Sequence, residues 1–288
     1  MHGDFGISSD GLSVRRPSTS WLIPLFVVSG ANGLCFEILW ARQLQVVVGS
    51  TSKAVTAVVG VFMLGLALGG ALGARWAPRL RRPALAYGLS ELGIGFSAVA
   101  VTLLLPRLEV LTSLPLRYGL AAAFLLVPST LMGLTFPCVI QAADSQARAG
   151  GGALYAANTA GAMLGCLLSG FFGIGLLGIR GTAQVAAFFN LLCGATACWL
   201  FRGDPTPAAV VEVPHAPLSP DGRRVFALLV AAGLSGASAL AAEILWTRAL
   251  LPYVNSSSYA FAAIMVCYLA GLALGAAWVA SRCARLRV

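Results

Sequence analysis

The stretch GLCFEILWAR, residues 33–42, decides how this chain folds, because it places a glutamate and an arginine inside a long apolar run. A charged side chain at the centre of a bilayer costs about 3 kcal/mol on insertion scales, so Glu37 needs a partner or a wet cavity. The stretch recurs as ALAAEILWTR, residues 239–248, with Glu, Trp and Arg at the same spacing. This repeated motif indicates a membrane protein built from two related parts.

The composition excludes a water-soluble globular domain. Of the 288 residues, 58% are hydrophobic and 10% are charged, and the mean hydropathy is +0.86. A soluble domain carries about 25% charged residues. The net charge of +9 could suggest a nucleic-acid partner. The arginines, however, gather in short segments between apolar runs, as the positive-inside rule describes, so we expect no nucleic-acid binding.

Apolar runs of about 20 residues, the length that spans a bilayer as a helix, occur along the whole chain. They cover residues 21–47, 52–76, 84–105, 118–142, 152–175, 181–201, 225–250 and 258–281. The sequence therefore predicts an all-α polytopic membrane protein with about eight transmembrane helices. The expected organisation is an N-terminal tail (1–20), a six-helix bundle (21–201), a linker (202–224) and a two-helix start of a second repeat (225–288).

The basic residues predict the orientation. If the N-terminus is cytoplasmic, most of the 19 lysine and arginine residues fall on cytoplasmic segments. We therefore expect a bacterial-type inner membrane location, with both termini and the linker in the cytoplasm. The seven cysteines form no C-x-x-C pair. This pattern predicts neither a metal site nor a disulfide framework, and no cofactor is expected.

The repeat predicts how the two parts are arranged. A shift of 206 residues superposes Glu37 on Glu243 and also places GLALG at 65–69 on GLALG at 271–275. The shift spans six expected helices, an even number, so both copies enter the membrane in the same direction. Parallel six-helix repeats relate the halves of major-facilitator transporters. We expect one complete six-helix half followed by the first two helices of a second half.

Four polar residues inside the apolar runs are candidates for an intramembrane polar site: Glu37, Glu91, Asn158 and Glu243. A parallel repeat places Glu37 and Glu243 at the same depth, and in a major-facilitator arrangement they face each other across the central cavity. Two interpretations stay open. The carboxylates either bind a small cation or a proton, or they accept hydrogen bonds that fix helix packing. Asn158 has the same alternatives, an interhelical hydrogen bond or cavity lining.

Four further residues of the repeated motif are expected at the membrane interface: Trp40, Arg42, Trp246 and Arg248. Five residues of α-helix turn through about 500°, so Glu37 and Arg42 do not share a face. Arginine near a helix end can extend its guanidinium to the headgroups. The arginines are therefore expected near the outer surface, whereas the glutamates face protein or a wet cavity.

Five stretches together resemble the membrane part of spermidine-synthase-like proteins, the fused major-facilitator/spermidine synthase family. They are SGANGLCFEILWARQLQVVVGST, FMLGLALGGALGARWA, YGLSELGIGF, PSTLMGLTFPCVIQA and LYAANTAGAMLGCLLSGFFGIGLLGIRGT. The resemblance runs in order through most of residues 21–281. It implies a membrane module that accompanies a Rossmann-like aminopropyltransferase domain. The glycine-rich loop and acidic residues of that domain do not occur here, so no catalytic residue is expected and enzymatic activity stays open.

Three functions are consistent with these patterns. The resemblance implies a membrane module that anchors or serves a separate polyamine-related partner. The intramembrane glutamates favour a major-facilitator-like carrier of a small cation. The incomplete second repeat favours a structural subunit of a larger membrane complex. In each case we expect a protein partner, or a second copy of the chain, to cover the last two helices.

Overall fold

The computed structural model describes residues 21–49, 51–143, 151–202, 222–250, 253 and 257–286. These residues are helical almost throughout and contain no strand, which confirms the all-α prediction for this part of the chain. The expected tail (1–20) and most of the expected linker (202–224) lie outside the described residues.

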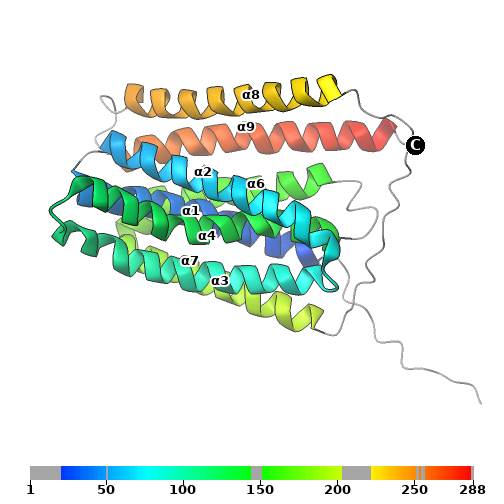
Figure 1. Cartoon of the computed structure of the whole chain (residues 1–288), viewed down its shortest axis with the longest axis horizontal. Coiled ribbons are helices and arrows are strands. Elements are labelled where there is room, and N and C mark those ends of the chain that lie inside the picture. Colours follow the sequence, from blue (N-terminus) through cyan, green and yellow to red (C-terminus); the bar gives the residue numbers. More distant parts are fainter. Residues whose placement is uncertain are drawn as a thin grey trace, which may run out of the picture.

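The helices run back and forth along one common direction, as Figure 1 shows. They are α1 (Leu22–Val48), α2 (Thr51–Trp76), α3 (Pro83–Leu104), α4 (Leu114–Ala142), α6 (Gly151–Leu167), α7 (Ile174–Phe201), α8 (Gly222–Leu250) and α9 (Ser257–Leu286). Two short 3₁₀ turns, η2 (Ala77–Arg79) and η3 (Leu105–Val110), follow α2 and α3, and a π-helical turn, η4 (Leu168–Gly173), joins α6 to α7.

The ends of several helices follow from local chemistry. Gly49 ends α1 in the left-handed region with φ 69°, and its N–H donates to the Gln45 carbonyl at 2.9 Å. Proline opens α3 at Pro83, where a missing N–H costs nothing. At the same end of the bundle as Gly49, Arg117 of α4 donates to the carbonyls of Val47 and Leu111 at 2.6 and 2.7 Å. These bonds tie the start of α4 to the end of α1.

Seven helical stretches of the described chain are long and apolar enough to cross a membrane. The expected count of eight differs because residues 151–201 form one helical stretch of 51 residues. This stretch turns back on itself at Gly178, which has φ 68° and ψ 178°. A Cβ built on Gly173 would lie 2.7 Å from Thr182 Cγ2, whereas nine residues of straight helix span about 13 Å. The stretch before Gly178, which includes α6, and the part of α7 after Gly178 therefore run in opposite directions (Figure 1).

Three helix pairs make the main contacts of the bundle: α2 with α4, α1 with α6, and α3 with α7. The larger apolar core surrounds α1, where Phe36, Leu39 and Trp40 are completely buried. Helix α9 packs on α6, and α8 lies at the edge of the molecule, in light contact with α9 and α2 (Figure 1). The second copy of the repeat, α8 and α9, is thus less enclosed than the first.

Glycines let the helices of the first copy approach one another closely. A Cβ on Gly69 of α2 would fall on the backbone of α4 at Thr130, and one on Gly30 of α1 would fall on Asn158 of α6. Such small-residue contacts are typical of helix packing in membranes. The counterparts of these two glycines in the second copy, Gly275 and Gly236, have nothing within 4 Å of an added Cβ.

Candidate intramembrane carboxylate site

Glu37 lies in the middle of α1 with 0% of its surface exposed. Within the described residues, neither of its carboxylate oxygens has a hydrogen-bond partner. Two groups from other helices lie within range of an electrostatic interaction with this carboxylate: Glu243 of α8 and Cys166 of α6. The two glutamates that the repeat relates are therefore close enough to interact electrostatically.

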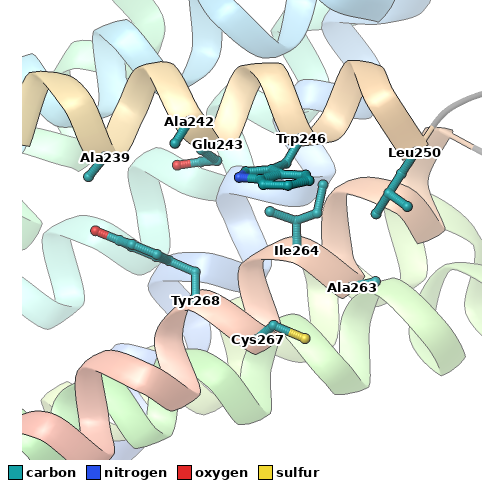
Figure 2. A pocket seen from close by; sticks show the side chains of 9 residues that line it. All are labelled: Ala239, Ala242, Glu243, Trp246, Leu250, Ala263, Ile264, Cys267 and Tyr268. Atoms are coloured by element: carbon teal, nitrogen blue, oxygen red, sulfur yellow. The ribbon is translucent and has the colours of Figure 1, made fainter.

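Glu243 is the second carboxylate of this site and is 5% exposed. Its Oε1 has no hydrogen-bond partner among the residues that the structure describes. The side chain projects from α8 into the space between α8 and α9, as Figure 2 shows. Glu37 is thus the inner carboxylate, and Glu243 is the one that a ligand can reach.

The space beside Glu243 is a cavity of about 500 Å³. Its walls come from α8 and α9 and consist of Ala239, Ala242, Glu243, Trp246, Leu250, Ala263, Ile264, Cys267 and Tyr268. The hydroxyl of Tyr268 and the carboxylate of Glu243 lie on the same side of the cavity in Figure 2. This volume is within the range of small-molecule sites, in which a few polar groups orient a ligand against apolar walls.

The helix turn next to the carboxylates is irregular. Residues Leu168–Gly173 form the π-helical turn η4, directly after the helix that carries Cys166. A Cβ on Gly170 of this turn would lie on Ala262 of α9 and 3.9 Å from Ile38, the neighbour of Glu37. Single π-helical turns inside α-helices occur frequently at functional sites. The irregular turn thus lies where α1, α6 and α9 meet around the inner carboxylate.

Glu91 lies elsewhere and has a different environment. It is completely buried on α3, and its Oε1 accepts a hydrogen bond from Ser29 Oγ of α1 at 2.5 Å. Its backbone carbonyl accepts a hydrogen bond from Asn190 Nδ2 of α7 at 2.7 Å, and Asn32 Nδ2 donates to Asn190 Oδ1 at 3.2 Å. This polar network joins three helices. Glu91 Oε2, like Glu243 Oε1, has no hydrogen-bond partner among the described residues. The bonds to Oε1 and to the backbone carbonyl favour the packing interpretation for Glu91, and the structure does not bring Glu91 to the Glu37–Glu243 pair.

The other expected site residues fall into different surroundings. Trp40 is completely buried and stacks on Phe36, with ring centroids 5.4 Å apart, so its indole contacts protein and not lipid. Its counterpart Trp246 is 63% exposed and lines the cavity. Arg248 is exposed near the end of α8.

Two expected polar residues make contacts that the sequence left open. Arg42 donates a hydrogen bond to Gln45 Oε1 on its own helix at 3.3 Å. Asn158 faces Gly30 at one of the close approaches between α1 and α6, and it does not line the cavity. Asn158 therefore belongs to the packing of these two helices.

Several residues of these sites were missed from the sequence. Asn32 and Asn190 are polar residues inside apolar runs, and this signal alone could have identified them. Cys166 and Tyr268 carry no such signal, because cysteine and tyrosine are common in apolar helices. Their places beside Glu37 and in the cavity depend on how α6 and α9 pack, which is visible only in the fold.

No family model matches the chain, and neither a curated protein nor a solved structure is significantly similar to it. The fold shows the class only: a multi-helix protein whose apolar helices are compatible with a multi-pass membrane protein. In the described ranges, no group of three or more His, Cys, Asp or Glu side chains is arranged to hold a metal ion.

Proposed function

We propose that this chain is a membrane protein that crosses the bilayer eight times and binds a small cation between Glu37 and Glu243. Eight crossings follow if the two limbs on either side of Gly178 each span the membrane, since residues 151–201 are too long for a single helix across a core of about 30 Å. The major-facilitator-like arrangement and the bacterial-type inner membrane location belong to the same proposal.

One observation carries the cation site: both oxygens of the fully buried Glu37 have no hydrogen-bond donor among the described residues. An unpaired buried acceptor costs about 1–3 kcal/mol, and more if it is charged. Glu243 lies nearby and is also incompletely paired. A bound ammonium group, or a proton shared by the two carboxylates, would supply the missing donors.

The chemistry of the surroundings favours an amine over a metal ion. Trp246 and Tyr268 present aromatic rings beside Glu243, and such rings attract ammonium groups through cation–π interactions. An ammonium also brings three hydrogen-bond donors, which matches a site composed of unpaired carboxylate oxygens. The resemblance to the membrane part of spermidine-synthase-like proteins supports the same ligand class, but no catalytic residue is assigned.

The test is amine binding by the purified chain in lipid nanodiscs, measured with a radiolabelled alkylamine. We expect Glu37→Gln and Glu243→Gln to weaken binding about tenfold or more, because each removes one negative charge of the carboxylate pair that attracts the cation. Glu91→Gln is the matched control, since Glu91 is equally buried but lies in a separate hydrogen-bonded network. Unchanged binding in the double variant at residues 37 and 243 would reject the site.

The same variants separate binding from packing. If Glu37 and Glu243 only fix helix packing, glutamine should change neither amine binding nor the free energy of unfolding by much. Leucine should then lower the free energy of unfolding. If they bind a cation, glutamine should abolish binding and leave stability almost unchanged. Denaturant unfolding in mild detergent measures the stability.

We also propose that α8 and α9 dock on further transmembrane helices, from a partner or a second copy of this chain. The supporting observation is that, in the described part of the chain, a Cβ added at Gly236, Gly271 or Gly275 would have nothing within 4 Å. The first-copy counterparts of these glycines pack closely on α4 and α6. Native mass spectrometry from mild detergent tests this proposal. We expect an oligomer or a complex that Gly271→Leu weakens, and a strictly monomeric chain that remains active would contradict it.

A further inference from the structure

The two copies of the repeat differ at the positions that surround the outer carboxylate. Ala242 occupies the position equivalent to Phe36, and Tyr268 occupies the position equivalent to Phe62. In the first copy, Phe36 stacks on Trp40 and all three aromatic residues are buried, so the space beside Glu37 is filled. In the second copy a methyl group replaces the phenyl ring, and the cavity lies there.

This exchange gives the second copy both room and a polar group. The cavity has a volume of about 500 Å³, and Ala242 lies in its wall next to Glu243. The tyrosine adds a hydroxyl where the first copy has a plain phenyl ring. The second copy thus has a smaller side chain and an additional hydroxyl beside its glutamate. These two differences favour ligand binding over a purely structural role.

The wall of the cavity carries a single charge. Among its nine residues, Glu243 is the one ionisable as an acid near neutral pH, and the others are aliphatic, aromatic or thiol side chains. A ligand with one ammonium group can pair with Glu243. A second ammonium elsewhere in the cavity would lie against Ala263, Ile264 or Leu250, where an unpaired charge is costly.

The cavity is open toward the surroundings of the molecule. Trp246 and Tyr268, on its rim, are 63% and 40% exposed. Trp246 lies four residues before the end of α8 and Tyr268 lies in the middle part of α9 (Figure 2). Both are on the flank where α8 forms the edge of the bundle (Figure 1). In a chain that spans the membrane, this flank faces the hydrocarbon of the lipids.

We infer that this cavity binds an amphiphilic monoamine, a ligand with one ammonium group and an apolar tail, which enters sideways from the bilayer. The ammonium pairs with Glu243 and contacts the rings of Trp246 and Tyr268, and the tail lies along the aliphatic wall. The inference rests on the proposed cation site and names its ligand class. It separates a fatty amine from a polyamine, whose several charges the wall cannot pair.

The test compares ligands of equal length in nanodiscs that contain the whole chain. Octylamine, octanediamine and octanol each compete against radiolabelled octylamine, with empty nanodiscs as the control for partition into lipid. We expect octylamine to compete at least about tenfold better than the diamine, because the diamine places a second charge against an apolar wall. Octanol should compete poorly because it cannot pair with the carboxylate.

Two variants on α8 test the place of binding. Ala242→Phe restores the residue of the first copy and fills the cavity, and we expect it to weaken octylamine binding about tenfold or more. Ala241→Phe adds the same ring at the neighbouring exposed position, which does not line the cavity, and should bind like the unaltered chain. Glu243→Gln should remove the preference for octylamine over octanol.

The outcomes separate this inference from the proposed function. Equal competition by octylamine and octanediamine overturns the monoamine inference and leaves the cation site standing, and so does full octylamine binding by Ala242→Phe. No saturable binding of any amine overturns both. The ligand comparison uses the unaltered chain, so it decides the inference even if Ala242→Phe does not fold.

Discussion

Ser29 Oγ donates a hydrogen bond of 2.5 Å to Glu91 Oε1 and so joins α1 to α3 inside the bundle. The Glu91 backbone also accepts a hydrogen bond from Asn190, which brings α7 to the same point. Glu37, only eight residues from Ser29 on the same helix, has no such donor in the described structure. Two equally buried glutamates therefore lie in different hydrogen-bond environments, and we expect their variants to behave differently.

Replacement of Glu91 should destabilise the fold. Glu91→Leu removes the acceptor of the Ser29 hydroxyl, and a loss of this kind costs about 1–3 kcal/mol in free energy of unfolding. Glu91→Gln keeps an acceptor oxygen and should cost less. Denaturant unfolding in mild detergent measures both, and amine binding should persist in the glutamine variant. A loss of binding in Glu91→Gln as large as in Glu37→Gln would contradict the separate roles.

The repeat offers a matched pair of glycines for a second prediction. Gly69→Ala places a methyl group against the Thr130 carbonyl of α4, and overpacking of this kind costs about 1–3 kcal/mol. Gly275→Ala makes the same change at the equivalent position of α9, where no atom of the described residues lies within 4 Å of the added Cβ. We expect its unfolding free energy to stay within about 0.5 kcal/mol of the unaltered chain. Equal effects in the two variants would contradict the difference in packing.

The reversal between α6 and α7 depends on the backbone of Gly178. Its φ of 68° and ψ of 178° fall in a region that is open essentially to glycine alone. Gly178→Ala should therefore lower the free energy of unfolding by about 1–3 kcal/mol. Gly175→Ala is the control, because nothing lies within 4 Å of an added Cβ at this helical position. If Gly178→Ala is as stable as the control, the fold does not require the conformation of Gly178.

Topology can be measured directly. If the chain crosses the membrane eight times with cytoplasmic termini, reporter fusions at Arg82, at Ser219 in the expected linker and at the C-terminus should all read cytoplasmic. A fusion at Tyr253, between α8 and α9, should read on the outer side. A fusion at Arg82 or Ser219 that reads on the outer side would overturn the proposed orientation.

The sequence predicted the site through the cost of charge in hydrocarbon and through the repeat. The first identified Glu37 and Glu243 as residues that need an explanation, and the second placed them at equal depth. In the structure the two carboxylates lie within range of an electrostatic interaction. The motif alone could not separate Trp40 from Trp246, because the burial of each indole depends on the helices that surround it.

The cavity was within reach of the sequence but was not predicted. It arises where the second copy has Ala242 in place of Phe36. This difference is visible when the side chains at equivalent positions of the two copies are compared by size. The polar network around Glu91 was harder to predict. Asn32 and Asn190 are 158 residues apart, and only the packing of α1 on α7 brings their amides together.

The π-helical turn η4 changes the neighbours of one continuous helix. Before it, Gly161 and Gly165 face the backbone of α1, whereas Gly170 within it faces Ala262 of α9. A π turn accommodates about one residue more than an α turn, so it rotates everything beyond it relative to a regular helix. Deletion of a single residue from Leu168–Gly173 would leave a regular α-helix. The part of the helix after the deletion would be rotated by about 100° about the helix axis. The segment therefore acts as a spacer whose length, more than its side chains, sets which helix α6 meets on each side of the inner carboxylate.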